Sequence, residues 1–397
     1  MNLVLFLDVL DVAGAQCQFA ALACGLARRG HSVTFVTLWP GGVHWDRLGA
    51  QQTIVLRSLY RHRGASMPQR LAQYAGAPRR LAGILRERRA DVLYGALHSI
   101  NLLARLATLM ARNVPVVWSV RSAGQAIPWK QQPGFQLCRL LSRSVPLIVS
   151  NSRAGLVHHR SLGFRPGADC VIPNGVDVAT FRPDQPERHR IRAEWGVQPQ
   201  HCLIGVVARL VPVKNHAAFL RAAAMLADRS PDVRFVCVGD GSAGFRAQLQ
   251  QQAHALALDD RLLWAGERHD MAAVYNALDV ACLSSVAEGM PNAVAEAMAS
   301  AVPCVVTDVG DATELVADTG IVVPSDDAPA LAEALWTLVQ EDVDVRRSLG
   351  ERARDRIVER FSVEAMVTAT EQAFERVVGQ RNEVLHAAGR GRPRPAL

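Results

Sequence analysis

Short apolar runs alternate with longer amphipathic segments from one end of this chain to the other. The first three are LVLFLDV, CQFAALACGLARRG and HSVTFVTL. Runs rich in β-branched residues predict strands, and apolar positions three or four apart predict helices. Strands that alternate with helices are typical of parallel βαβ units, so the pattern predicts an α/β fold with doubly wound parallel sheets.

Seven strands are predicted in the first 180 residues, and Gly30 is expected to end the first helix as its C-terminal cap. The strands after the first two are TIVLRSL, DVLYGAL, PVVWSV, PLIVSN and DCVIPN. The stretch NGVDVATFRPDQPERHR then loses its apolar period and gains proline and charge. We therefore expect a linker near residues 180–200.

The second half repeats the pattern and turns helical from Ala328, after five strands: CLIGVVA, VRFVCVG, RLLWAG, DVACLSS and VPCVVT. The expected divisions are two Rossmann-like domains, 1–182 and 183–365, a helix over 366–385 that can pack back on the first domain, and a disordered tail, 386–397. Open parallel sheets bind ligands in crevices, so we expect a site between the two halves.

The composition is that of a globular protein, with 397 residues, 49% of them hydrophobic, and a formal charge of +7. A disordered or fibrous chain is excluded. The charge is uneven, because residues 1–180 carry +14 and the remainder −7. Arginine supplies nearly all the basic side chains, and the only lysines are Lys130 and Lys214.

The eight cysteines are widely spaced, with no C-x-x-C pair, which predicts free thiols in a reducing compartment and no structural zinc. The N-terminal run MNLVLFLDVLD lacks a basic region, and Asp8 interrupts it too early for a signal peptide. No stretch approaches the roughly 18 apolar residues of a membrane span. We expect a cytoplasmic protein that can still touch the inner face of the membrane.

The densest candidate site is the segment EGMPNAVAE, which leaves a strand, crosses a loop at Gly289 and enters a helix with Pro291 at its first position. Free backbone N–H groups and the positive end of the helix dipole suit a phosphate there. Glu288 lies before the helix and Glu296 about one turn inside it. A carboxylate can accept hydrogen bonds from both hydroxyls of a ribose or sugar diol.

A second candidate cluster is VVARLVPVKNH, where Arg209 follows a strand and Lys214 lies five residues later. Two cations at the end of a strand can hold a diphosphate from the side opposite the helix N-terminus. The lysine is notable in a chain that uses arginine almost everywhere else.

Together with VGDG and VIPNGVD, these two segments resemble family 4 of the retaining glycosyltransferases, in order over nearly the whole chain. The resemblance implies a GT-B architecture, two Rossmann-like domains facing a cleft, with a nucleotide-sugar donor held mainly by the second. It further implies that Arg209 and Lys214 hold the donor diphosphate, Glu288 touches the donor sugar and Glu296 binds the ribose hydroxyls.

The same resemblance assigns further donor contacts. Backbone amides over Met290, Pro291, Asn292, Ala293 and Val294 would hold sugar and phosphate, next to Gly289. Gly239 would also line the donor site, and Glu267 and Arg268 would lie near the base. In the first domain, the turn Ala13-Gly14-Ala15-Gln16 would approach the phosphates and acceptor, and His98 the reacting carbon.

The chain departs from the family pattern at four of these positions. Ala13 and Gln16 stand where the family often has Gly and Glu, Ser284 where it often has Pro, and Asn215 where it often has Gly. The implied mechanism uses fixed cations and the departing diphosphate oxygen as base, so no cofactor or divalent metal is expected. The one D-x-D, Asp342-Val343-Asp344, falls in a predicted helical region.

Two other interpretations remain open. An oxidoreductase is suggested by G-x-G-x-x-G at Gly239–Gly244 with Glu267 as a ribose acid, although this leaves the cation clusters unexplained. A nucleotide-sugar hydrolase or epimerase of the same fold is a second alternative. Nucleic acid is not an expected partner, because no basic patch is interleaved with aromatics.

For the acceptor, the segment HSINLLARLATLMARNVPVVWSVRS resembles bacterial polysaccharide and glycolipid enzymes of the family. The resemblance implies a UDP-sugar donor and an acceptor that is a growing glycan or is linked to a polyprenyl diphosphate. The amphipathic basic segments MPQRLAQYAGAPRRLAGILRERR and FQLCRLLSRS would suit an anionic membrane surface, or are solvated helix faces.

Overall fold

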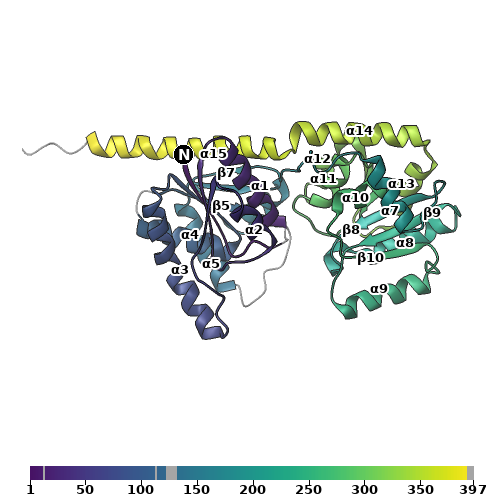
Figure 1. Cartoon of the computed structure of the whole chain (residues 1–397), viewed down its shortest axis with the longest axis horizontal. Helices are drawn as coiled ribbons and strands as arrows, with labels where there is room; N and C mark the ends of the chain where they lie inside the picture. The colour runs from purple at the N-terminus through teal and green to yellow at the C-terminus, as the bar shows by residue number, and fades with distance from the viewer. Residues whose placement is uncertain (12–13, 112–113, 122–131, 391–397) are drawn as a thin grey trace, which may run out of the picture. The chain divides into compact units, whose positions relative to one another are not determined.

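The computed structural model describes residues 1–11, 14–111, 114–121 and 132–390, which form two α/β units. The first unit comprises Met1–Gly175 together with Val363–Leu397, and the second comprises Val176–Ser362. Each unit has one parallel sheet with helices on both faces (Figure 1). The predicted class, two doubly wound parallel-sheet units, is confirmed.

In the described part of the first unit, seven parallel strands lie in the order β3-β2-β1-β4-β5-β6-β7. All seven were predicted. The elements are β1 (Asn2–Leu7), α1 (Gly14–Arg28), β2 (Ser32–Thr37), α2 (Val43–Gly49), β3 (Ile54–Ser58), α3 (Met67–Glu87), β4 (Val92–Ala96), α4 (His98–Ala111), β5 (Val116–Val120), α5 (Gln132–Leu141), β6 (Leu147–Ser150), α6 (Arg153–Ser161), β7 (Ala168–Val171) and the last helix, α15 (Val363–Arg390).

The second unit repeats the arrangement with six parallel strands in the order β10-β9-β8-β11-β12-β13. Its elements are α7 (Gln185–Glu194), β8 (Cys202–Val207), the 3-10 turn η3 (Pro212–Lys214), α8 (His216–Ala227), β9 (Val233–Val238), α9 (Ala243–Ala255), β10 (Leu262–Gly266), α10 (Met271–Ala277), β11 (Val280–Leu283), α11 (Asn292–Ala299), β12 (Cys304–Thr307), α12 (Ala312–Val316), β13 (Gly320–Val323), α13 (Ala328–Gln340) and α14 (Val343–Arg360).

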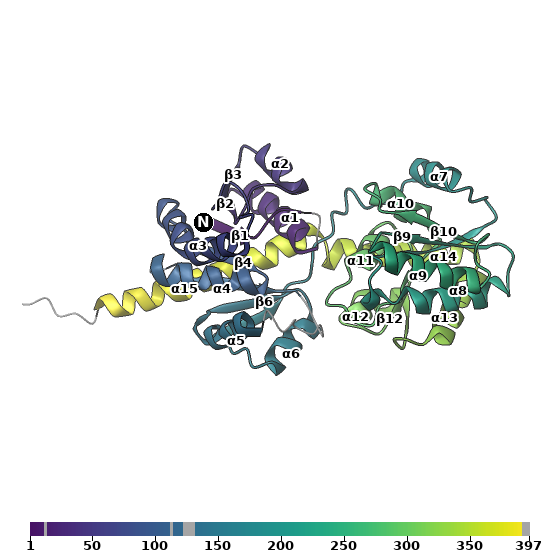
Figure 2. The same ribbon diagram turned by 90° about the horizontal axis from the view of Figure 1, so that it is seen from below.

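Alternation of side chains along the strands divides each unit's core between the two faces of its sheet. In β1, Leu3 and Leu5 face a cluster with α1 and α15, whereas Val4 and Phe6 face one with α3, α4 and α5. Both faces are apolar because helices cover both, which is why the strands read as continuous apolar runs. Figure 2 shows the same layering from below.

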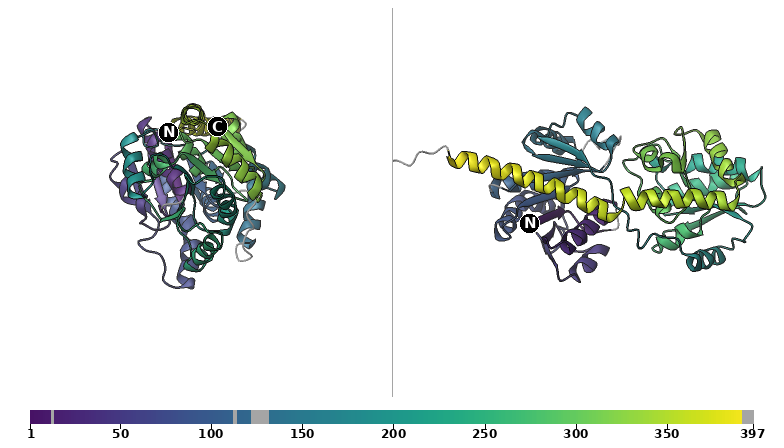
Figure 3. Two further views of the ribbon diagram at one scale, coloured as in Figure 1. Left: turned by 90° about the vertical axis from the view of Figure 1, so that its right-hand side faces the viewer. Right: turned by 90° about the horizontal axis from the view of Figure 1, so that it is seen from above.

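The last helix, α15, completes the first unit by packing on α1 (Figure 3). A Cβ at Gly25 would lie 2.4 Å from Val367 Cγ2, so the glycine permits the close approach of the two helices. Phe374 meets the ring of Tyr94 edge-on at 5.3 Å. At the rim, Glu371 pairs with both Arg29 at 2.7 Å and His31 at 2.5 Å.

The chain passes from the first unit to the second between two adjacent residues, earlier than the expected boundary at 182. Gln18 holds Gly175 through both its backbone N–H, at 2.7 Å, and its carbonyl, at 3.1 Å. The next residue, Val176, already belongs to the second unit, where its N–H donates to Phe361 O at 2.8 Å. The return crossing falls at Ser362 and Val363 instead of 365.

Two other sequence expectations are wrong, and one strand was missed. The supposed linker at 180–200 contains α7, because Asp184 caps it by accepting a hydrogen bond from the Glu187 backbone N–H at 3.1 Å. Strand β13 was not predicted. The tail expected at 386–397 is still helical up to Arg390, since Ala387 and Ala388 favour continuing the helix, and residues 391–397 lie outside the described part.

Candidate active site

The predicted donor residues of the second unit gather where its strand order reverses. Strands β8 and β11 are neighbours there, and the connections after them leave on opposite sides. Such a switch point opens a crevice at the carboxyl ends of the strands, where α/β proteins bind ligands. Arg209 and Lys214 follow β8, and Glu288 follows β11, so two segments far apart in sequence meet at one edge.

Hydrogen bonds tie these two loops together. Val286 N–H donates to Val213 O at 2.9 Å, and the Ser284 hydroxyl donates to Lys214 O at 2.9 Å. The Thr307 hydroxyl donates to Ser285 O at 2.7 Å from the end of β12. The family often has Pro where this chain has Ser284, and here the hydroxyl takes up a structural hydrogen bond.

Lys214 and Glu288 form an ion pair at the centre of this edge. Nζ of Lys214 lies 2.5 Å from Glu288 Oε1, which also accepts the Ser285 hydroxyl at 2.7 Å. Both side chains are largely buried. The next residue, Asn215, has φ 47° and caps α8 by accepting from the Ala218 N–H, so it tolerates a left-handed position often filled by Gly in the family.

Arg209, five residues before Lys214 in the sequence, is exposed. Among the described residues, no carboxylate forms an ion pair with its guanidinium, and no Asp or Glu occurs in the undescribed stretches. An arginine without a carboxylate partner keeps its five donors available for an anion. The edge therefore combines one paired and one unpaired cation.

The helix expected to bind phosphate, α11, starts at Asn292 and not at Pro291. Pro291 is its N-cap, with φ −77° and ψ 102°, because the residue before a helix has extended geometry. Of the following residues, Asn292 and Ala293 are partly exposed, and Val294 is buried in the core. First-turn N–H groups have no acceptor within their own helix, so they can bind an anion.

The loop before α11 packs closely against Gly310. This residue has φ 58°, and a Cβ there would lie 2.4 Å from the carbonyl oxygens of both Glu288 and Gly289. Asp311 N–H donates to Gly289 O at 2.8 Å. Met290 packs its side chain into the core.

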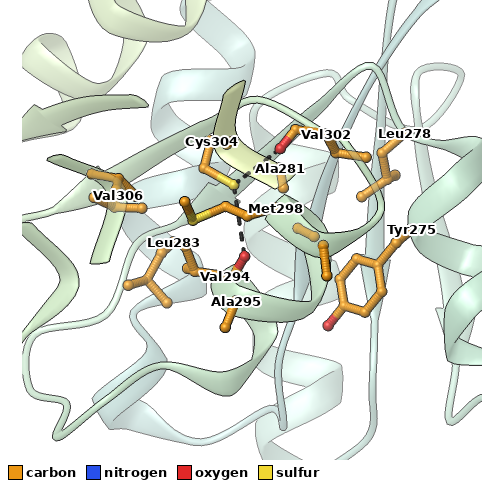
Figure 4. Packing of buried hydrophobic residues seen from close by; sticks show 14 of the residues in the cluster. Tyr275, Leu278, Ala281, Leu283, Val294, Ala295, Met298, Val302, Cys304 and Val306 are labelled. Atoms are coloured by element: carbon orange, nitrogen blue, oxygen red, sulfur yellow. Dashed lines mark hydrogen bonds between the residues drawn. The ribbon is translucent and has the colours of Figure 1, made fainter. Parts of the chain in front are cut away.

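Glu296, one turn into α11, is held by a residue that the sequence analysis missed. The hydroxyl of Tyr275, on α10, donates to Glu296 Oε2 at 3.0 Å. Burial raises the pKa of the Glu296 carboxyl to about 7, and the tyrosine hydrogen bond opposes that rise. Burial also raises the pKa of Tyr275 well above its usual value. Figure 4 shows Tyr275 among the apolar residues that pack around α11.

The three remaining second-unit residues differ in how available they are. Gly239 has φ 130°, and a Cβ there would lie 2.2 Å from Ala208 O, so only glycine fits. Glu267 is exposed. Arg268 pairs with Asp270 at 2.7 Å and Glu194 at 2.5 Å, so its charge is already compensated.

The structure argues against G-x-G-x-x-G at Gly239–Gly244 as a dinucleotide-binding motif. Gly241 lies against the Leu210 carbonyl, where a Cβ would come within 2.2 Å, so it serves the packing of the loop after β8. A Cβ at Gly244 would meet nothing within 4 Å. The third glycine of a dinucleotide fingerprint is needed for close packing of helix on strand, and that need is absent.

In the first unit, His98 is the first residue of α4, directly after β4 and Leu97, which has φ 76°. Its ring contacts Phe135 edge-on at 5.0 Å, and its Nε2 lies 3.1 Å from Nε2 of His159. Burial, followed by the neighbouring His159, lowers the pKa of His98 to about 4.

The expected turn after β1 is only partly visible in the structure. Gly14 and Ala15 begin α1, and Gln16 is buried in its first turn. Ala13 lies outside the described residues, as does Lys130.

Two sequence-family models match the chain. Residues 12–180 match Glycosyltransferase Family 4, and residues 201–341 match Glycosyl transferases group 1. The chain belongs to this glycosyltransferase family. Of the residues singled out in the second unit, Lys214 and Glu288 are in direct contact.

Several curated relatives are named as bacterial glycosyltransferases. UDP-Gal:alpha-D-GlcNAc-diphosphoundecaprenol alpha-1,3-galactosyltransferase of Escherichia coli is 32% identical over 49% of this chain and 50% of its own. A GDP-mannose-dependent phosphatidylinositol monomannoside mannosyltransferase of Corynebacterium glutamicum is 28% identical over 72% of this chain and 76% of its own. The match to EpsF of Bacillus subtilis spans 35% of that protein. The chain thus matches about a third of the length of EpsF and half of the length of the galactosyltransferase.

Solved structures share the whole fold. HepE of Anabaena in complex with UDP superposes with a TM-score of 0.80 over 94% of this chain and all of that one, at 21% identity. Sucrose-phosphate synthase of Thermosynechococcus elongatus superposes with a TM-score of 0.76 over 95% of this chain and 99% of its own, at 18% identity. These likenesses confirm the GT-B fold.

Within the described residues, no helix is long and apolar enough to cross a membrane. The D-x-D acids lie at the start of α14, where Asp344 pairs with Arg347 at 2.7 Å on the surface. The expected independence from metal stays a prediction.

Proposed function

We propose that this protein is a retaining glycosyltransferase that moves a sugar from a nucleotide donor, a UDP-sugar, to a lipid-linked or growing glycan acceptor. The observation that carries the proposal is the meeting of Arg209, Lys214 and the N-terminus of α11 at the β8/β11 switch point. Three sources of positive potential at one edge suit a diphosphate.

The two carboxylates complete the fit to a nucleotide sugar. Glu296 lies one turn inside α11, away from the loop, where it would accept the ribose hydroxyls. Glu288 lies beside Lys214, where it would contact the donor sugar. The relatives support this class of substrate, since their names specify UDP-galactose and GDP-mannose.

The proposed chemistry is electrostatic. Cleavage of the bond between the sugar and the diphosphate leaves negative charge on the leaving oxygen. The acceptor oxygen bonds to the anomeric carbon on the same face of the sugar, and the leaving oxygen takes the proton of the acceptor hydroxyl. Arg209, Lys214 and the α11 N–H groups stabilise the growing charge, and a divalent metal is not required. Removing one such donor typically costs about a hundredfold to a thousandfold in turnover.

Product analysis with a radiolabelled donor tests the proposal. Incubation with UDP-sugars and GDP-sugars and with polyprenyl-diphosphate glycans should yield a labelled glycan with the anomeric configuration of the donor. Label released only as free sugar would identify a hydrolase, and label retained on an altered nucleotide sugar would identify an epimerase. An inverted anomer would refute the retaining mechanism.

We also propose that the first unit binds anionic membranes through the outer face of α3, α4 and α5. Leu71 on α3, Leu109 on α4 and Leu140 on α5 are 64%, 53% and 62% exposed. Exposed arginines accompany them, including Arg79 and Arg139. Apolar side chains interleaved with basic ones suit a membrane interface.

Co-sedimentation with liposomes tests this surface. Binding should require anionic lipid, weaken with salt and fall when Leu71 and Leu140 are changed to Ser. Changing Val343 and Val345, exposed apolar residues on α14 of the other unit, is the matched control. Equal binding to neutral liposomes at high salt would refute the proposal.

A further inference from the structure

Two histidines of the first unit form a hydrogen-bonded pair whose proton positions follow from the structure. His159, on α6, is 2% exposed, and His98 begins α4 after the carboxyl end of β4. Nδ1 of His159 lies 2.8 Å from the Gly155 carbonyl oxygen, and its Nε2 lies 3.1 Å from Nε2 of His98.

The carbonyl of Gly155 can only accept a hydrogen bond, so Nδ1 of His159 must carry a proton. A neutral imidazole has one proton, which leaves Nε2 of His159 as an acceptor. The His98 nitrogen opposite it must therefore donate, so the His98 proton lies on Nε2. Nδ1 of neutral His98 is left with a free lone pair.

The surroundings keep both rings neutral and fixed. Phe164 contacts His159 edge-on at 5.2 Å, and Phe135 contacts His98 in the same way at 5.0 Å. Among the described residues, two other titratable groups lie beside the pair: His158 on α6, and Cys138 on α5, whose thiol donates to His98 O at 3.1 Å. Among the described residues, no carboxylate hydrogen-bonds to either ring. Burial lowers the pKa of both histidines.

We propose that His159 is a positioning residue: it fixes His98 in the tautomer protonated on Nε2, so that Nδ1 of His98 accepts a hydrogen bond from a sugar hydroxyl during transfer. The proposal deepens the proposed transferase function and rests on it. A neutral acceptor takes the hydroxyl proton in a hydrogen bond, whereas the other tautomer would present an N–H that can only donate to the hydroxyl oxygen. His98 is then neither a general acid nor a source of positive charge.

Nuclear magnetic resonance of the full-length protein tests the relay without any activity measurement. Two-bond proton–nitrogen correlations at pH 7 should show the Nε2-protonated tautomer for His98 and the Nδ1-protonated tautomer for His159. In His159→Phe, which keeps the aromatic packing but offers no acceptor, the His98 signals should move toward a mixture of tautomers. A His98 ring that is protonated on Nδ1, or charged, in the native protein would overturn the proposal.

Kinetics with the same variants test the role of the relay. His159→Phe should lower kcat by about tenfold to a hundredfold, with a smaller change in the donor KM, as the loss of an orienting partner does. His159→Gln, whose amide oxygen can accept from His98 and whose N–H₂ can donate to Gly155 O, should restore most of the activity. His158→Gln, one position away on the same helix, is the matched control and should behave as the native protein.

The outcomes separate this proposal from the function on which it rests. Native activity in His159→Phe together with an altered His98 tautomer would refute a role for the relay in transfer. The expected tautomers in a protein that transfers no sugar from any donor would refute the transferase function and leave the fixed His98 tautomer established.

Discussion

Replacing Glu296 by Gln should make the second unit more stable at alkaline pH, because the native carboxyl is buried. Its pKa is raised from 4.5 to about 7. A carboxyl with a raised native pKa does not affect stability below its unfolded pKa, and its ionisation destabilises the fold increasingly up to the native pKa. Full ionisation of Glu296 lowers the free energy of unfolding by about 3 kcal/mol, and about 2 to 3 kcal/mol of this loss develops between pH 5 and pH 8.

Glutamine removes this cost and can still accept the Tyr275 hydroxyl. We expect the melting temperature of Glu296→Gln, measured relative to the native protein, to be about 5–10 °C higher at pH 8 than at pH 5. Calorimetry without nucleotide at both pH values measures this, and UDP should stabilise the variant less than the native protein. Glu351→Gln, at an exposed position of α14, is the control. If Glu296→Gln and the native protein differed in melting temperature by the same amount at pH 5 and at pH 8, the reasoning would be refuted.

Four further outcomes are expected. Arg209→Ala and Lys214→Ala should each lower transfer about a hundredfold to a thousandfold in a labelled-donor assay, and near-native rates would contradict the leaving-group assignment. Asp279→Ala should cost about 3–5 kcal/mol in denaturant unfolding, because it leaves the largely buried Arg192, 2.9 Å away, without its carboxylate. Gly310→Ala should destabilise the second unit by more than 1 kcal/mol in the same assay, since its Cβ would collide with two carbonyls. Dialysis against EDTA should leave the transfer rate unchanged, and loss that Mg²⁺ restores would contradict metal independence.

The apolar pattern was sufficient to predict most strands because parallel strands are buried on both faces. Strand β13 was missed because it follows directly after a 3-10 turn, and as an edge strand it has three residues that are only partly buried. The α7 helix was missed because most of its residues are polar and Ile191 is its fully buried residue. A cap and arginine contacts stabilise this helix. Neither signal is periodic hydrophobicity.

At the site, residue types revealed the ligand groups but not their partners. Lys214 and Glu288 were both expected at the donor, yet their ion pair depends on two loops brought together by the strand order. Tyr275 lies in MAAVYNALD, where a tyrosine at an apolar helix position looks like an ordinary core residue. Its hydroxyl becomes informative only when the structure places the partly buried Glu296 3.0 Å away.

The membership of α15 in the first unit affects the order in which the protein can fold during synthesis. Part of that unit's core, including Val367 and Phe374, is translated after the whole of the second unit. At about 5–20 residues per second, the ribosome needs roughly 10–40 s to add the roughly 200 intervening residues. The second unit is continuous in sequence and can close as it emerges, whereas the apolar face of β1 and α1 stays uncovered for that interval. The first unit is therefore where a chaperone or an aggregating partner has time to act.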